Sequence, residues 1–172
     1  KAGSFAVAEV LRMLGGQSFS AAVFSVSTVQ EEVGLRGART SAFGVNPTVG
    51  IAVDVTHATD SPDMDKRRLG EVKIGKGPVI TFMDRSFIAD QRLVKLLVAS
   101  AQRLGIPYQF KQAVAGGTDS GVIHLSGEGV PAVTVAIPSR YIHSPVSIIS
   151  LADFDWTVQL MREALHTLER GL

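Results

Sequence analysis

Hydrophobic and polar residues alternate along the chain with two spacings, and each spacing predicts one kind of element. Apolar residues recur every three or four positions, as on one face of a helix, in the segments 2–14, 35–43, 86–104, 119–125 and 152–169. Short runs of strand-like composition occupy the segments 20–29, 48–56, 107–113 and 132–138. The two kinds of element therefore alternate along most of the chain.

This alternation predicts an α/β fold. We expect a three-layer sandwich with a mostly parallel central sheet and helices on both of its faces. The segment 57–78 is polar and rich in Gly and Pro, which predicts a long functional loop with a short edge strand at 71–74. At the start of the last helix, Asp153 is expected to be the N-cap, and Asp155 should lie near the positive end of the helix dipole.

Composition and charge narrow the class of protein. With 172 residues, 45% of them hydrophobic, the chain can form one compact domain with a core. Lys and Arg number 17 against 16 for Asp and Glu, so we expect neither a nucleic-acid nor a membrane partner. The sequence contains no cysteine, so any metal ligands must be His or carboxylates. Without a spanning apolar run or a leader, a soluble, cytoplasmic protein is expected.

Four residues with acid/base or metal-binding chemistry follow the predicted strands. Glu31 and Glu32 come after the first strand, Asp54 lies near the end of the second, and His143 follows the last. In open α/β sheets, functional groups gather outside the carboxyl ends of the strands. A pair of divalent ions needs oxygen and imidazole ligands, together with a free carboxylate that takes a proton from bound water. Adjacent glutamates could divide these two tasks.

Each of these residues also has an ordinary explanation. A Glu-Glu pair that opens a loop is most often solvated charge, and a single histidine is more often packed or surface-exposed than a ligand. Asp54 is harder to explain in this way, because an unpaired carboxylate in an apolar strand is costly to bury. The segment 115–121 is either a turn with Asp119 as a helix cap or a loop that lines a substrate. The remaining histidines are expected to be structural: His57, His124 and His166.

Taken together, the motifs are more specific than any single residue. The stretches "TVQEEVGLRGA", "AVDVTHATDSPD", "IGKGPVI", "IPYQ", "GGTDSG" and "GVPAVTVAIPSRYIHSP" occur in this order. In this combination the chain closely resembles the M42 family of metallo-aminopeptidases, over nearly its whole length. That family includes glutamyl, deblocking and tetrahedral aminopeptidases, and some relatives have been labelled endoglucanases.

The resemblance implies a role for each candidate residue. Glu31 matches the catalytic general base, and three residues match metal ligands: Glu32, Asp54 and His143. Gly117, Thr118 and Asp119 would line the substrate side. The resemblance further implies two divalent metal ions, most often zinc or cobalt, peptide substrates, and a homo-oligomer built from dimers to a dodecamer.

Two of the family's ligands have no counterpart in the chain, namely an early His and an Asp that bridges the ions. The start "KAGSFAVAEVL" resembles the continuation of the bridging motif, so that Asp is expected just before Lys1. Residues 1–172 are therefore expected to be the C-terminal portion of a single metallopeptidase catalytic domain, without its N-terminal strands and inserted β domain. A paired-carboxylate glycosidase and a non-catalytic scaffold remain alternatives, and metal dependence separates the glycosidase from the peptidase.

Overall fold

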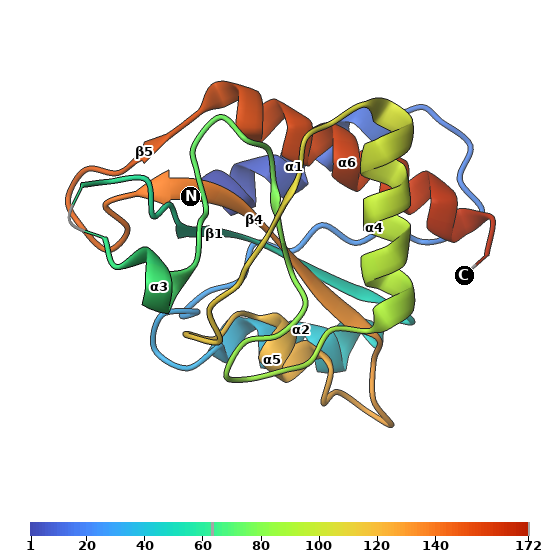
Figure 1. The fold of residues 1–172 in the computed structure, drawn as a ribbon. Helices are drawn as coiled ribbons and strands as arrows, with labels where there is room; N and C mark the ends of the chain where they lie inside the picture. The colour runs from blue at the N-terminus through green and yellow to red at the C-terminus, as the bar shows by residue number, and fades with distance from the viewer. Residues whose placement is uncertain (63, 172) are drawn as a thin grey trace.

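The computed structural model describes residues 1–62 and 64–171, which form a sheet between two layers of helices (Figure 1). The helices are α1 (Ala2–Leu14), α2 (Arg36–Val45), α3 (Lys66–Leu69), α4 (Gln91–Leu104), α5 (Ser120–Ile123) and α6 (Leu151–Glu169). The strands are β1 (Gly50–His57), β2 (Val79–Thr81), β3 (Gln109–Phe110), β4 (Ala132–Arg140) and β5 (Ile148–Ile149). No helix within these ranges is both long and apolar enough to cross a membrane.

Strand β4 organises the sheet. The strand order is β1-β4-β2-β3, and β5 adds to the end of β4. The longest ladder joins β1 and β4 in parallel over eight positions, from Gly50 opposite Ala132 to His57 opposite Ser139. The β2–β3 ladder is also parallel, whereas β2 and β5 pair with β4 antiparallel. Figure 1 shows α1, α4 and α6 on one face of the sheet and α2 and α5 on the other. The expected α/β class with helices on both faces is therefore confirmed.

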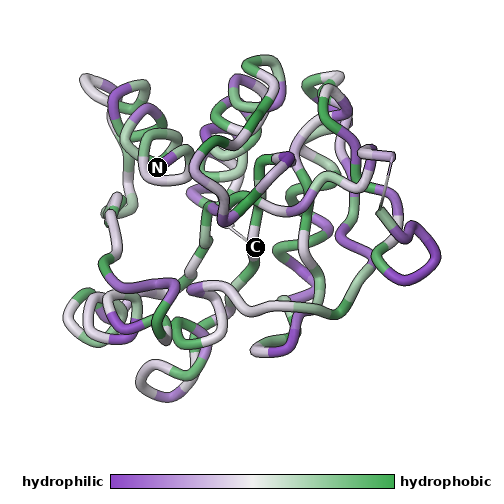
Figure 2. Tube along the Cα trace, turned by 90° about the vertical axis from the view of Figure 1, so that its left-hand side faces the viewer, coloured by the Kyte–Doolittle hydropathy of each residue, from purple (hydrophilic) through white to green (hydrophobic). Residues whose placement is uncertain are grey.

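The main core lies between the sheet and the α1, α4 and α6 layer. Helix α4 directs Leu93, Leu97 and Ala101 into it at four-residue intervals, as an amphipathic helix does. Eight of the nine residues of β4 are buried, because the strand has helices on both faces and neighbours on both sides. In Figure 2 the hydrophobic stretches accordingly run through the middle of the molecule, whereas several peripheral loops are hydrophilic.

Several elements differ from their sequence-based predictions. The segment 20–29 is not a strand, because no strand of the described chain lies beside it to form a ladder. The expected edge strand at 71–74 is also absent, and the same loop instead contains the short helix α3, capped by Asp65. Helix α4 begins at Gln91 rather than at residue 86, because the Asp90 carboxylate caps it by accepting the Arg92 N–H at 2.8 Å.

Asp153 has a different role from the one predicted. Helix α6 begins after Ser150, and Asp153 lies in its first turn, fully buried. The Asp153 carboxylate accepts the backbone N–H groups of Gly75 at 2.6 Å and Gly77 at 2.8 Å. Gly77 has a φ of +89°, and a Cβ at this position would overlap the Pro107 carbonyl oxygen. The acidic residue thus anchors the "IGKGP" turn on the helix instead of capping the helix.

Candidate active site

The carboxyl ends of β1 and β4 meet at one edge of the sheet, which we call the rim. Because these strands are parallel, Asp54 near the end of β1 lies at the same edge as the loop that leaves β4 and carries His143. The loop after residue 29 brings Glu31 and Glu32 to this edge as well. Glu32, the neighbour of Glu31, contacts His143 across this edge.

Glu32 and His143 are in direct contact although 111 positions separate them in the sequence. His143 Nε2 lies 3.0 Å from Glu32 Oε2. Both side chains are largely exposed, at 63% for His143 and 71% for Glu32. A carboxylate oxygen and an imidazole nitrogen that face each other at the surface are a pair of donors suited to a divalent ion.

The backbone on both sides of this pair turns sharply. Gln30 has a φ of 57°, and His143 itself has a φ of 61°, a left-handed conformation that is uncommon for residues other than glycine. Helix α2 starts at Arg36, shortly after the glutamates, and its Gly37 donates its N–H to the Val29 carbonyl at 2.9 Å. A Cβ on Gly37 would overlap the Val29 backbone. The glycine therefore lets α2 pack against residue 29, which fixes the turn that carries both glutamates.

Glu31 is the most perturbed carboxyl group of the rim. Partial burial, followed by repulsion from Asp54, Glu32 and Asp119, raises the pKa of Glu31 from its usual 4.5 to about 7, and His143 opposes this shift. A carboxyl group that titrates near neutral pH is suited to taking up and releasing a proton. Glu31 therefore has the electrostatic properties expected of a general base.

Two further rim carboxyl groups, Asp54 and Asp119, are also held in unfavourable surroundings. Burial raises the pKa of Asp54, and repulsion from Asp119 and Glu32 adds to the shift, although the Val55 N–H donates to Asp54 at 2.7 Å. Burial likewise raises the pKa of Asp119, against the hydrogen bond from Thr28. Mutually repelling carboxylates with raised pKa values are an arrangement that a bound cation would stabilise.

The raised pKa of Glu31 predicts how the stability of the metal-free chain depends on pH. Because Glu31 binds its proton more tightly when folded than when unfolded, stability should fall as the pH rises from about 4.5 to about 7 and remain lower above that range. We expect Glu31→Gln to stabilise the chain at pH 8 by on the order of 1 kcal/mol, since solvent screens part of the repulsion, and to have no such effect at pH 4. Urea unfolding at the two pH values measures this change in the free energy of unfolding. Glu128→Gln, at an exposed position, is the control, and an equal gain in stability in that variant would contradict the prediction.

The three residues expected on the substrate side differ in orientation. Asp119 belongs to the rim: its Oδ2 accepts the Thr28 hydroxyl at 2.7 Å, and its Oδ1 is buried without a hydrogen-bond partner among the described residues. Thr118 is buried, and its hydroxyl contacts Asp84 at 3.2 Å and Thr134 at 2.8 Å. Gly117 packs against Ser86, since a Cβ there would lie 3.2 Å from the serine hydroxyl. Of these three, Asp119 is thus the side chain that is coupled to the other rim carboxylates.

Two further residues near the rim were not singled out by the sequence. His57 was expected to be structural, but its ring centroid lies 6.2 Å from that of His143 in an edge-to-face arrangement. Lys111, half-buried, donates from Nζ to the Ala115 carbonyl at 2.7 Å and interacts electrostatically with Asp54. The position of His57 at the end of β1, three residues after Asp54, was a signal that could have identified it.

The other two histidines fit their structural assignment. His124 Nδ1 lies 2.9 Å from the Ser120 carbonyl oxygen, and its ring packs near Phe87. The His166 ring packs near that of Phe19, with 5.4 Å between their centroids. Both lie outside the rim.

The rim residues are of the types that bind divalent ions, but they are too few to hold an ion by themselves. Carboxylate oxygens and an imidazole are suitable ligands, and the Glu32–His143 pair supplies one of each. Within residues 1–62 and 64–171, however, no three His, Asp or Glu side chains are grouped closely enough to hold an ion by themselves. The described chain thus offers a partial set of ligands.

A sheet that gathers carboxylates and imidazoles at its carboxyl edge is typical of α/β enzymes. Residues 1–160 match the family model described as M42 glutamyl aminopeptidase. The chain therefore belongs to the M42 family of peptidases. The family resemblance drawn from the motifs is confirmed.

Curated relatives with similar sequences agree with this assignment. A putative aminopeptidase of Acetivibrio thermocellus is 48% identical over 143 residues, which are 83% of this chain and 42% of the relative. A lysyl aminopeptidase of Pyrococcus furiosus is 37% identical over 96% of this chain and 46% of the relative. The chain thus spans less than half the length of these relatives.

Solved structures share the fold. A TET aminopeptidase from a marine-sediment Thaumarchaeota archaeon superposes with a TM-score of 0.90 at 39% identity, over 95% of this chain and 46% of that one. A structure described as PhTET1-12s, a dodecamer in the asymmetric unit, gives a TM-score of 0.80 at 31% identity, over 92% of this chain and 46% of that one. A protein of Thermotoga maritima described as an endoglucanase gives a TM-score of 0.70 at 30% identity, over 97% of this chain and 49% of that one.

Proposed function

We propose that this chain forms part of a metal-dependent aminopeptidase that removes N-terminal residues from peptides. The observation that carries the proposal is the rim itself. In a chain of the M42 family, a carboxyl group with a pKa of about 7, Glu31, lies among further carboxylates and beside the Glu32–His143 contact. Such a group of acids at the end of a sheet is suited to metal-assisted hydrolysis.

Each rim residue has a proposed role. Glu31 accepts a proton from the attacking water and can pass it to the departing amine, because a group with a pKa near neutral does both. Glu32, Asp54 and His143 are proposed metal ligands, and Asp119 with the 116–118 backbone borders the substrate. Two divalent ions, zinc or cobalt, would polarise the scissile carbonyl and activate the water when bound. Further ligands would come from residues outside this chain.

We also propose that the active protein is a homo-oligomer. The support is the relative described as a dodecamer, whose fold this chain shares with a TM-score of 0.80. Large apolar side chains on the surface are compatible with contacts between subunits, among them Phe43, Leu151 and Val146 at 81%, 77% and 72% exposure.

Hydrolysis of a glycosidic bond is the second candidate, because one relative is described as an endoglucanase. Paired carboxylates could act as acid and base there as well. Metal dependence distinguishes the two functions, since a retaining or inverting glycosidase needs no divalent ion. A non-catalytic scaffold is the third candidate, and it would show neither activity.

One assay tests the proposal. We expect residues 1–172 alone to bind at most one zinc ion weakly and to show negligible turnover of aminoacyl-p-nitroanilides. The reason is that the chain's own ligands are too few to hold two cations about 3.5 to 4 Å apart without a shared anion. Adding the remaining part of the peptidase should give chelator-sensitive turnover. Two tightly bound ions and robust turnover by this chain alone would refute the expectation, and turnover that resists chelation would refute the proposed function.

A further inference from the structure

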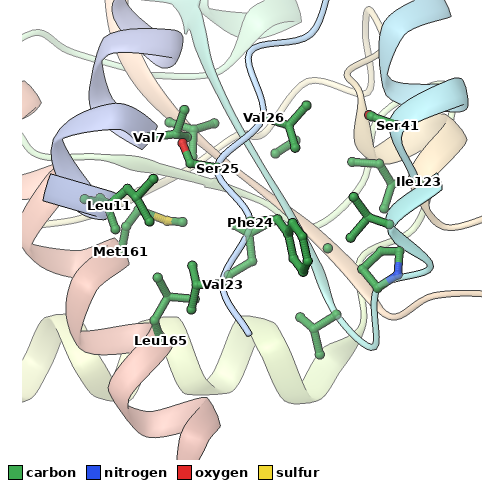
Figure 3. A pocket seen from close by; sticks show the side chains of 18 of the residues that line it. Val7, Leu11, Val23, Phe24, Ser25, Val26, Ser41, Ile123, Met161 and Leu165 are labelled. Carbon is green, nitrogen blue, oxygen red and sulfur yellow. The ribbon is translucent and has the colours of Figure 1, made fainter. Parts of the chain in front are cut away.

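The rim borders an apolar region and a polar loop. The apolar region is a cavity of about 810 Å³ beside β1, which side chains such as Val23 and Ile123 line together with Asp119 of the rim (Figure 3). The polar loop is the segment 57–78, which follows β1 and forms hydrogen bonds and an ion pair with the end of β4. Because β4 leads directly into the loop that carries His143, these polar contacts act close to that histidine.

His143 lies in a loop that is closed at its base. Strand β5 runs antiparallel along the end of β4, with Ile148 opposite Arg140. Residues 141–147 therefore form a hairpin connection between the two strands, which we call the His143 loop. The side chain of Arg140 belongs to the base of this loop, three residues before the histidine.

The backbone of the His143 loop is held in a conformation that is uncommon for its residues. Tyr141 has a φ of 60° and His143 a φ of 61°, in the left-handed region that disfavours residues other than glycine. Such residues persist where the surrounding contacts over-determine them. Inside the loop, the Ser144 hydroxyl lies 2.6 Å from the carbonyl oxygens of both Tyr141 and Val146. The loop therefore needs a firm base as well as this internal contact.

An ion pair joins the base of the loop to the segment after β1. Arg140 Nε donates to Asp60 Oδ1 and Arg140 Nη2 to Asp60 Oδ2, both at 2.8 Å, which is the bidentate geometry of a strong pair. Asp60 Oδ2 also accepts the Ile74 N–H at 3.2 Å. The hydrogen bonds from Arg140 lower the pKa of Asp60, so the carboxylate stays charged at neutral pH.

Asp60 is itself held in place by its neighbour Thr59. The Thr59 N–H donates to the Val72 carbonyl at 2.7 Å, and the Thr59 hydroxyl donates to the Gly70 carbonyl at 2.8 Å. Thr59 is also buried, at 2% exposure. The carboxylate that receives Arg140 thus belongs to a fixed part of the 57–78 segment.

We propose that Asp60 and Arg140 are positioning residues, which together hold the His143 imidazole opposite Glu32. The pair acts through the backbone of the His143 loop, so neither residue is catalytic. His57, three residues before Asp60, packs its ring against that of His143, so the same segment contacts the histidine twice. The inference rests on the proposed function, in which His143 binds a metal ion.

A similar ion pair outside the rim provides a matched control. Arg103 of α4 donates from Nε and Nη2 to Glu163 of α6, at 3.1 and 2.7 Å. The side chains of Arg103 and Glu163 are 49% and 23% exposed, and those of Arg140 and Asp60 are 35% and 16% exposed. Partly exposed pairs of this kind contribute modestly to stability. An effect on metal binding that appears in Arg140→Gln but not in Arg103→Gln therefore reports the position of His143.

The zinc affinity of the assembled peptidase tests the proposal. We expect Arg140→Gln to weaken one of two zinc ions by about 10- to 100-fold, because residues that orient a metal ligand have effects of this size. The affinity for the other ion should stay unchanged, as should both affinities in Arg103→Gln. With cobalt in place of zinc, the visible absorption of one ion should change in Arg140→Gln, because its ligand geometry changes.

Further variants test whether the two residues act as a pair. Arg140→Lys keeps the charge but cannot form two parallel hydrogen bonds, so it should recover only part of the affinity. Asp60→Asn should weaken the same ion as Arg140→Gln. The double variant should be no weaker than Arg140→Gln alone, because each single change already breaks the pair. Additive losses would show that the two residues act separately, which would overturn the proposal.

His143→Ala distinguishes a failure of this inference from a failure of the proposed function. If His143→Ala left both zinc affinities unchanged, His143 would not be a metal ligand, and the proposed function and this inference would both be wrong on that point. If His143→Ala weakened one ion while Arg140→Gln behaved like Arg103→Gln, the positioning inference alone would be overturned.

Discussion

Replacing Glu31 by glutamine is expected to lower turnover of the assembled peptidase by about 10²- to 10⁴-fold and to leave its metal content unchanged. Glutamine keeps the size of the side chain but cannot accept a proton. Glu31 is suited to that step because burial and neighbouring carboxylates raise its pKa to about 7. Turnover of an aminoacyl-p-nitroanilide and elemental analysis of the bound metal measure the two halves of this result.

Glu32→Gln is the matched comparison, since it makes the same chemical change one residue further along. Glu32 contacts His143 rather than lying among the buried carboxylates, and we propose that it binds metal. Removing the Glu32 carboxylate should therefore lower both the metal content and the turnover. If both variants lost metal equally, or if Glu31→Gln kept most of its activity, the division of labour between the two glutamates would be wrong.

Much of the fold could be predicted because its largest elements have strong local patterns. The segment 132–138 is a compact apolar run and forms the buried strand β4, and the apolar periodicity of 2–14 gives α1 at the expected positions. The strand-end rule also predicted that Asp54, His143 and the two glutamates would lie at one edge of the sheet, and the structure places them there. Their proposed roles as base and ligands remain predictions.

The errors share a physical cause, namely a dependence on distant parts of the chain. The segment 20–29 has the composition of a strand, but a strand also needs a neighbour, and none lies beside it. The edge-to-face contact between His57 and His143 joins the end of β1 to a loop far along the chain. Asp153 has the local pattern of a helix cap, yet its hydrogen-bond partners lie 78 and 76 positions away. No local pattern reports such contacts.

Replacing Asp153 by alanine is expected to lower the free energy of unfolding of the chain by about 2 to 4 kcal/mol. The carboxylate is fully buried and accepts two backbone N–H groups, from Gly75 and Gly77. Alanine would leave both donors without a partner and would leave a space where the carboxylate was. The conformation of Gly77 prevents an easy rearrangement, because it has a positive φ and lies against the Pro107 carbonyl.

Urea unfolding of three variants measures this effect. Asp153→Asn keeps one acceptor oxygen and should lose less stability than Asp153→Ala. Asp155→Ala is the control, since Asp155 lies in the same first turns of α6 but is exposed, so its loss should cost no more than about 0.5 kcal/mol. Amide exchange should accelerate at Gly75 and Gly77 in Asp153→Ala and remain slow in Asp155→Ala. Equal stability of the two alanine variants would show that other contacts hold the "IGKGP" turn and that Asp153 does not anchor it.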